Sequence, residues 1–355
     1  MLALSMRGRI ERSVAKVLFS LPHGTQVLLS RRPPIRVAGQ TMHPEMQLLW
    51  ATRESVGTAQ LRASTPQQAR RRLRRDVLRH TPSRLPPVDV NDLTISGGDG
   101  PIGARHYAPR ELGGPHALLV YFHGGGFVTG DLDTHDAVCR FLCDGACVHV
   151  LAVDYRLAPE HPFPAAVDDA RAALRWAFAN AEKLGADPSR VAVGGDSAGG
   201  ALSAVVSQLS ARDGGQAPSL QLLIYPPLDR TRSWPSHTLF DGYLLSRADM
   251  RWYDELYADT RPEVMADPRI SPLVAPDLSG LCPAIIVTAG FDPLRDEGEA
   301  YAAALQTAGT PAFLKREDGM LHGFVNMVGV SRAAREAVKG IARLLRVRLR
   351  DARFD

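Results

Sequence analysis

Short apolar segments alternate with longer amphipathic segments along most of the chain after residue 91. The short segments are rich in β-branched residues, as are strands that helices cover on both faces of a sheet. We expect strands at residues 93–96, 102–107, 117–122, 148–154, 190–194, 220–225, 284–289 and 312–315. The intervening segments predict helices that include residues 164–184, 199–211, 296–308 and 331–350. Such an alternation indicates an α/β fold with a mostly parallel sheet flanked by helices.

Two segments lack this alternation. Residues 1–90 predict helices with irregular breaks, the clearest of which follows the N-cap residue Thr65 and begins at Pro66. Residues 229–276 contain no convincing strand, and we expect them to form a helical lid between two core strands. The aromatic side chains of this lid either line an apolar pocket or pack its helices together. The two core parts would then be residues 91–228 and 277–355.

The 355 residues carry a formal net charge of +4, which is unevenly distributed. Residues 1–90 contain 16 basic and 5 acidic residues, whereas the rest of the chain contains 26 basic and 33 acidic residues. We interpret the basic excess as the solvated face of Arg-rich helices, with a nucleic-acid or membrane surface as the alternative. No aromatic residue interrupts the Arg-rich stretch 70–75 and no nucleic-acid-binding motif is present, so we expect no nucleic-acid partner.

The first residues predict neither a secretory signal nor a transmembrane span, because charges interrupt every apolar stretch. Ile10, Val14, Val17 and Leu18 have the spacing of one face of a short amphipathic helix. We expect this helix to pack on the protein. Peripheral contact of residues 1–40 with a membrane is the alternative.

Three of the four cysteines, Cys139, Cys143 and Cys147, recur every four residues and would share one face of a helix. This spacing is poor for a disulfide and lacks the paired cysteines of a zinc site. We therefore expect buried free thiols, no metal site and a cytoplasmic location.

The clearest chemical motif is a G-x-S-x-G sequence around Ser197, directly after one expected strand and directly before an expected helix. A serine on such a sharp turn needs small neighbours, which Gly195 and Gly199 supply. The turn exposes the hydroxyl at the carboxyl end of the sheet, beside backbone N–H groups and a helix N-terminus. The pattern predicts a serine nucleophile.

A second motif, His123-Gly124-Gly125-Gly126, follows another expected strand. Consecutive glycines allow backbone N–H groups to approach a ligand closely. We expect the N–H groups of Gly124, Gly125 and Ala198 to form an oxyanion hole, with His123 and Gly126 in support. A phosphate-binding loop would require a different glycine spacing or a lysine, and neither is present here.

A serine nucleophile needs a base and an acid that orients the base. On this fold the acid follows the serine along the chain, and the base follows the acid. Only His237 and His322 come after Ser197, and His237 lies in the expected lid, so we assign His322 as the base. Asp292 lies at the end of the strand 284–289 and is assigned as the acid. Asp296 falls inside the next helix, where a structural role is expected.

Five segments together resemble the bacterial hormone-sensitive-lipase-like carboxylesterases of the α/β-hydrolase superfamily. They are HGGGFVTGDLDTHD (123–136), DYRLAPEHPFPAAVDDA (154–170), GGDSAGG (194–200), FDPLRDEG (291–298) and HGF (322–324), and the resemblance extends from about residue 48 to the C-terminus. It implies the same nucleophile, acid and base, a cap built from the N-terminal segment and the lid, and no cofactor. It also implies small ester substrates with short to medium acyl chains, and it suggests a homodimer.

Two carboxylates, Glu160 and Asp196, are expected near the site, where structural hydrogen bonding is favoured over catalysis. A non-catalytic ligand receptor on the same fold is the main alternative to an esterase. Such receptors resemble this family but lack the catalytic histidine, and His322 is present here, so the sequence favours hydrolysis.

Overall fold

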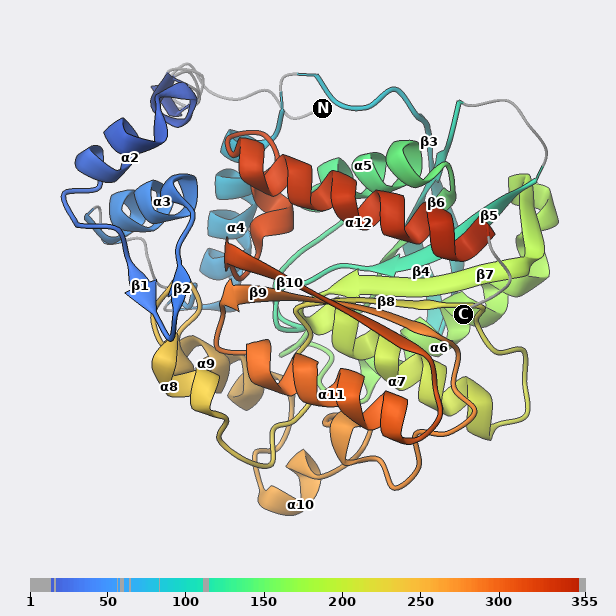
Figure 1. Ribbon diagram of the computed structural model, residues 1–355. Coiled ribbons are helices and arrows are strands. Elements are labelled where there is room, and N and C mark those ends of the chain that lie inside the picture. Colours follow the sequence, from blue (N-terminus) through green and yellow to red (C-terminus); the bar gives the residue numbers. More distant parts are fainter. Residues whose placement is uncertain are drawn as a thin grey trace.

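An eight-stranded sheet forms the centre of the computed structural model (Figure 1). The structure describes residues 14–350 apart from residues 16, 56, 58–60, 64, 83 and 111–114. In spatial order the strands are β10 (Ala312–Leu321), β9 (Ala284–Phe291), β8 (Gln221–Ile224), β7 (Ala186–Asp196), β5 (His116–Phe122), β6 (His149–Asp154), β4 (Gly100–Ala108) and β3 (Asp89–Gly97). The pairings of β4 with β3 and with β6 are antiparallel, and the other pairings of this sheet are parallel. The predicted mostly parallel α/β sheet is confirmed.

Strand β10 extends much further than the sequence predicted, to Leu321 rather than residue 315. It is the edge strand next to β9, and its side chains alternate between exposed and half-buried positions. The charged residues 315–318 do not match the apolar pattern from which the strands were predicted. An edge strand with one face in solvent can carry charged side chains, whereas a central strand does not. The extension matters for the site, since it brings His322 directly to the strand end.

Helices cover both faces of the sheet (Figure 1). On one face α5 (Asp136–Ala146) and α12 (Arg332–Arg350) pack with strand residues such as Leu119. On the other face α6 (Ala165–Asn180) and α7 (Ala198–Arg212) pack with Leu118 and Val120, while α11 (Arg295–Thr307) covers β9 and β10. Alternate residues of β5 thus serve opposite cores, and burying each such side chain contributes roughly 2 kcal/mol. Three short 3₁₀ helices, η1 (Glu182–Leu184), η2 (Pro272–Val274) and η3 (Phe324–Met327), lie between these elements.

A cap built from two distant parts of the sequence covers the end of the sheet (Figure 1). The N-terminal part contains α2 (His23–Leu29), the short hairpin of β1 (Arg36–Val37) and β2 (Gln40–Thr41), α3 (Pro44–Ser55) and α4 (Pro66–His80). The insertion contributes α8 (Pro235–Leu239), α9 (Arg247–Tyr257) and α10 (Pro262–Met265). The indole N–H of Trp50 donates to the Gly242 carbonyl at 2.9 Å, so the two parts are bonded to each other.

The structure corrects the predicted face of the first helical segment. Val14 and Val17 are 52% and 61% exposed, whereas Ala15 and Phe19 pack against the core. The contact face is therefore rotated from the predicted one, with the large Phe19 ring as its anchor. Ile10 lies outside the described residues, and membrane contact of residues 1–40 stays a prediction. Among the described residues, no helix has the length and apolar character to cross a membrane.

The cysteines follow the prediction with one exception. Cys139 and Cys143 are buried on α5, but that helix ends at Ala146, and Cys147 follows it with a left-handed φ of 55°. All four cysteines are buried, and none of them forms a disulfide.

Candidate active site

Ser197 lies on the turn between β7 and α7, with φ 53° and ψ −121°. This backbone conformation is strained for a residue with a side chain. A Cβ at Gly195 or at Gly199 would overlap the Phe122 carbonyl oxygen of the neighbouring strand, so both positions require glycine. The predicted turn is present, and it directs the serine to the carboxyl end of the central strand.

The structure brings the predicted acid, base and nucleophile together. His322 Nε2 lies 3.0 Å from Ser197 Oγ, and His322 Nδ1 lies 2.7 Å from Asp292 Oδ2. Because a carboxylate accepts, Nδ1 is assigned the proton and Nε2 is left to accept from the serine hydroxyl. The other oxygen of Asp292 accepts the Leu294 N–H at 2.9 Å, and Asp292 is completely buried. The Tyr225 ring packs on the imidazole with centroids 4.6 Å apart.

The two other candidates for acid and base have structural contacts instead. His237 lies in α8, where its Nε2 is 3.5 Å from the carboxylate of Glu297. Asp296 accepts the backbone N–H of Ser236 at 2.9 Å and thereby attaches the cap insertion to α11.

The glycine loop differs from the prediction at its first glycine. The Gly124 N–H donates to Asp196 Oδ1 at 3.0 Å, so it is directed at a buried carboxylate and is not free for an oxyanion. The Gly124 carbonyl accepts from His123 Nδ1 at 2.8 Å. A trans peptide directs its N–H opposite to its carbonyl, so the Gly125 N–H points away from His123. The assignment of Gly124 as an oxyanion donor was therefore wrong.

Three N–H groups remain around the serine without an acceptor in the described part of the chain. They belong to Gly125, Gly126 and Ala198, the first residue of α7. Gly125 and Gly126 have φ of +124° and +62°, a region that glycine adopts without strain. Gly125 and Gly126 line the same cavity as Ser197, so their N–H groups are available to a ligand bound there.

Asp196 holds this loop in place. Its carboxylate accepts from the Tyr121 hydroxyl at 2.7 Å as well as from the Gly124 N–H, and His135 Nε2 lies 3.4 Å away. Burial opposes its ionisation, but His135 and the two donors prevail and lower the pKa of Asp196 below its ordinary value. The predicted structural role of Asp196 agrees with these contacts.

Residues 119–326 match the family described as alpha/beta hydrolase fold. The chain is 48% identical to carboxylic ester hydrolase LipN of Mycobacterium tuberculosis, over 91% of this chain and 87% of LipN. It is 44% identical to carboxylesterase NlhH of the same species, over 87% of this chain and 97% of NlhH. The chain belongs to the hormone-sensitive-lipase-like carboxylesterases of the α/β-hydrolase superfamily. The protein is therefore a carboxylic ester hydrolase.

A solved structure agrees with that assignment. The carboxylesterase superposes with a TM-score of 0.82 on a mutant of LAE6, an alpha/beta hydrolase enzyme from the metagenome of Lake Arreo, Spain. The two chains are 39% identical, and the match covers 86% of this chain and 98% of the other.

A cavity of about 460 Å³ opens above Ser197 in the carboxylesterase, and His322 and the glycine loop line its base. Both parts of the cap contribute apolar walls, which include Leu49, Leu61, Leu73, Val77, Leu244, Leu245 and Met250. Of the lid aromatics, Tyr253 lines the cavity, while Phe240 and Tyr257 are buried among core residues. Among the described residues, no group of His, Cys, Asp and Glu side chains could hold a metal ion.

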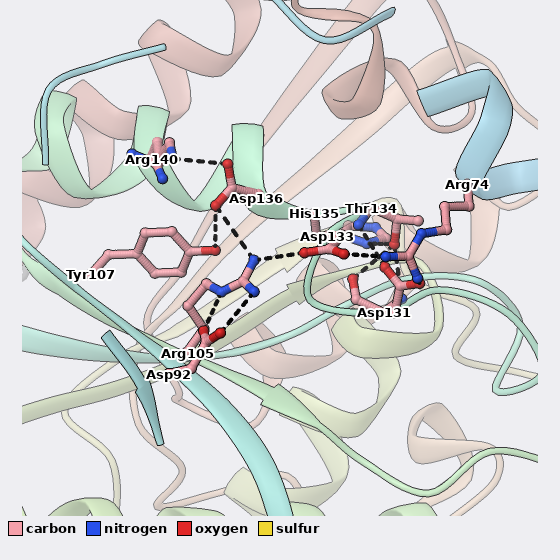
Figure 2. A network of polar contacts seen from close by, with 10 residues as sticks. All are labelled: Arg74, Asp92, Arg105, Tyr107, Asp131, Asp133, Thr134, His135, Asp136 and Arg140. Carbon is pink, nitrogen blue, oxygen red and sulfur yellow. Dashed lines mark hydrogen bonds and ion pairs between the residues drawn. The ribbon is translucent and has the colours of Figure 1, made fainter. Parts of the chain in front are cut away.

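Two arginines of α4 form contacts that the sequence did not predict. Arg74 binds the carboxylates of Asp131 and Asp133 in the loop that follows the glycines, and Arg105 continues this network from Asp133 (Figure 2). Arg70, one turn earlier, binds Glu160 through both carboxylate oxygens. The interpretation of the Arg-rich helix as a solvated face holds for Arg71, which is exposed, but was wrong for these two.

Glu160 consequently lies beside the cap helix rather than beside the nucleophile. Its ion pair with Arg70 lowers the pKa of Glu160 to about 2. The only available signal in the sequence was the spacing of Arg70 and Arg74, which places both on one side of α4.

Proposed function

We propose that the carboxylesterase hydrolyses esters through an acyl-enzyme, with Ser197 as nucleophile, His322 as base and Asp292 as orienting acid. The observation that carries this proposal is the continuous pair of contacts, 2.7 Å and 3.0 Å, from acid to base to serine at the base of the cavity. These contacts also favour a hydrolase over a ligand receptor, for which an aligned base would have no use.

The proposed reaction begins when Ser197 Oγ attacks the ester carbonyl carbon and His322 Nε2 takes the hydroxyl proton. The carbonyl electron pair moves to oxygen and returns when the C–O bond to the alcohol breaks, while His322 protonates the departing alkoxide. Water then attacks the acyl-enzyme with His322 as base again, which releases the acid and restores the serine.

The developing oxyanion would accept from the N–H groups of Gly125, Gly126 and Ala198. Gly126 enters this set because the Gly124 N–H is bonded to Asp196. Such donors act most strongly where they are fixed before the reaction and shielded from water, and one direct donor is typically worth about 3 kcal/mol in the transition state.

The cavity supports a preference for esters of short to medium acyl chains. Its volume of about 460 Å³ lies toward the lower end of the range for small-molecule sites, and most of its exposed wall surface is apolar, although charged side chains such as Arg72 and Asp254 also line it. A long acyl chain would have to extend between the two parts of the cap.

A chain-length series of p-nitrophenyl esters, from acetate to palmitate, tests this function on the full chain and on Ser197→Ala. We expect a maximum at short to medium length and a loss of about 10⁶-fold in kcat for the variant. A fluorophosphonate probe should label the full chain but not Ser197→Ala. Ser189→Ala is the matched control, because Ser189 is exposed at the opposite end of β7.

Undiminished turnover by Ser197→Ala would overturn the proposed mechanism. An unaltered chain that binds esters without cleaving them would favour the receptor alternative.

A further inference from the structure

The side chain of Arg70 extends from the cap helix α4 into the core beside the glycine loop. Its Nε donates to the Val128 carbonyl at 2.7 Å, and its Nη2 donates to the Ala158 carbonyl at 2.8 Å. Its two terminal nitrogens also bind Glu160 at 2.9 Å and 2.6 Å. Arg70 therefore has one fixed orientation, in which Nε is directed at a single peptide carbonyl.

That carbonyl belongs to the peptide group between Val128 and Thr129. Because a trans peptide is planar, the Thr129 N–H points opposite to the Val128 carbonyl. It donates to the Gly125 carbonyl at 2.9 Å. The same Gly125 oxygen also accepts the Val128 N–H at 3.1 Å and the Thr129 hydroxyl at 3.0 Å.

The same geometry applies once more at the next peptide group. The Gly125 carbonyl is held on the side of Val128 and Thr129, so the Gly126 N–H points in the opposite direction. Gly126 lines the cavity beside Ser197, and its N–H has no acceptor among the described residues. A row of hydrogen bonds thus leads from Arg70 through two peptide groups to this N–H beside the cavity.

We propose that Arg70 is a positioning residue that orients and polarises the Gly126 N–H through these two peptide groups. The inference rests on the proposed function, in which that N–H stabilises the oxyanion. Hydrogen bonds in series strengthen one another, and a cation at one end draws electron density along the row. A polarised N–H stabilises a full negative charge more than it stabilises a neutral carbonyl oxygen. The polarisation therefore favours the transition state over the neutral ester.

This arrangement makes the oxyanion hole dependent on the cap. Val128 is completely buried and lies in the core, whereas Arg70 lies on α4. If α4 moves away, the Val128 carbonyl loses its cationic donor. The peptide group between Gly125 and Gly126 is then oriented and polarised less strongly. The oxyanion hole therefore stabilises the oxyanion most strongly when the cap is closed.

Arg74 provides a matched comparison for Arg70. It lies on the same helix and forms ion pairs with the core, with a side-chain exposure of 38% against 29% for Arg70. Its partners are the carboxylates of Asp131 and Asp133, not a peptide group of the row described above. Loss of either arginine weakens the attachment of α4, but only loss of Arg70 should alter the oxyanion hole.

The test measures kcat and KM for the best p-nitrophenyl ester with Arg70→Gln, Arg70→Lys, Arg74→Gln and the exposed Arg71→Gln. For both Arg70 variants we expect kcat to fall about tenfold, below the loss of 10² or more for a direct donor, with KM within about twofold. Lysine keeps the charge but cannot form the fork and the Nε contact together. Arg74→Gln and Arg71→Gln should keep the original kcat.

Two inhibitors separate positioning from mere packing. A trifluoromethyl ketone forms an oxyanion with the serine, whereas the methyl ketone of the same chain binds only as a neutral ligand. The inhibition constant of the first should rise in the Arg70 variants by the factor lost in kcat, and that of the second should not change.

An unchanged kcat in a folded Arg70→Gln or Arg70→Lys variant would overturn the inference. So would an equal loss of kcat in Arg74→Gln, since Arg70 would then act only by attaching the helix. Failure of the proposed function has a different signature, namely undiminished turnover by Ser197→Ala.

Discussion

The core and the cap of this carboxylesterase hold their groups at the site by different means. In the core, the serine turn has a fixed backbone conformation, with φ 53° at Ser197, and the glycine loop is held by the hydrogen bond from the Gly124 N–H to Asp196. In the cap, long arginine side chains cross to the core and end in ion pairs. Backbone geometry gives the core one arrangement, whereas ion pairs give the cap an attachment that can be released.

Asp196→Ala is the most severe test of the rigid core. It removes the acceptor of the Gly124 N–H and of the Tyr121 hydroxyl, and both donors are buried. We expect the free energy of unfolding to fall by about 3 kcal/mol, because each buried unsatisfied group costs about 1–3 kcal/mol. We also expect kcat to fall by about 10²-fold, since the glycine loop would lose its first anchor. Urea unfolding and ester kinetics measure the two effects.

Asp196→Asn is the matched variant, because its amide oxygen can still accept from Gly124. It should lose less stability and less activity than Asp196→Ala. Original kcat in a folded Asp196→Ala variant would contradict the view that this carboxylate holds the loop.

Gly126→Ala tests a contact where the cap meets the core. The new methyl group would overlap the Tyr253 ring of α9, and the φ of +62° is unfavourable for alanine by about 1 kcal/mol. We expect kcat to fall about tenfold, as the loop shifts away from the ring. Adding Tyr253→Ala should restore part of this loss, since the overlap disappears but the backbone strain remains. No recovery in the double variant would show that the ring does not press on the loop.

Glu160→Gln has the smallest expected effect and tests the releasable attachment of the cap. Arg70 lowers the pKa of the folded Glu160 from 4.5 to about 2. The charged form is therefore favoured in the folded state, and its contribution is present above pH 4.5 and is lost as the pH falls through about 2. Because the carboxylate is 43% exposed, we expect a difference of only about 0.5 kcal/mol at pH 7.

Unfolding by urea at neutral and acidic pH measures this difference between the original chain and Glu160→Gln. It should narrow on acidification, and a difference that widens would contradict the assignment. Glu255→Gln, at an exposed position of α9, is the control and should leave the unfolding free energy at pH 7 unchanged.

The sequence was sufficient to predict the core of the site because each group follows a strand. Ser197, Asp292 and His322 come after short apolar segments, and parallel strands end at one edge of a sheet. The spacing along the chain therefore implied that these residues are close in space. Even β10, which ends at Leu321 rather than at the predicted residue 315, did not disturb this reasoning, because its charged second half leads directly to His322.

The remaining details depend on contacts that no local pattern encodes. Whether the Gly124 N–H points at a substrate or at Asp196 is decided by a carboxylate 72 positions later in the chain. Likewise, Arg70 and its exposed neighbour Arg71 have the same chemistry, and they differ in that only Arg70 reaches the core at Val128, Ala158 and Glu160. Such assignments require the tertiary fold.

The N-terminal half of the cap has consequences for how the protein is made. The carboxylate of Glu45 on α3 accepts from the Ser331 hydroxyl at 2.5 Å and from the Ala333 N–H at 3.0 Å, at the start of the final helix. The first cap helices leave the ribosome long before these partners do. They must therefore wait, with the apolar side of α3 uncovered, until residues 331–333 have been synthesised. Because His322 also belongs to this late segment, the cap and the contact between His322 and Ser197 would be completed at the same stage of synthesis.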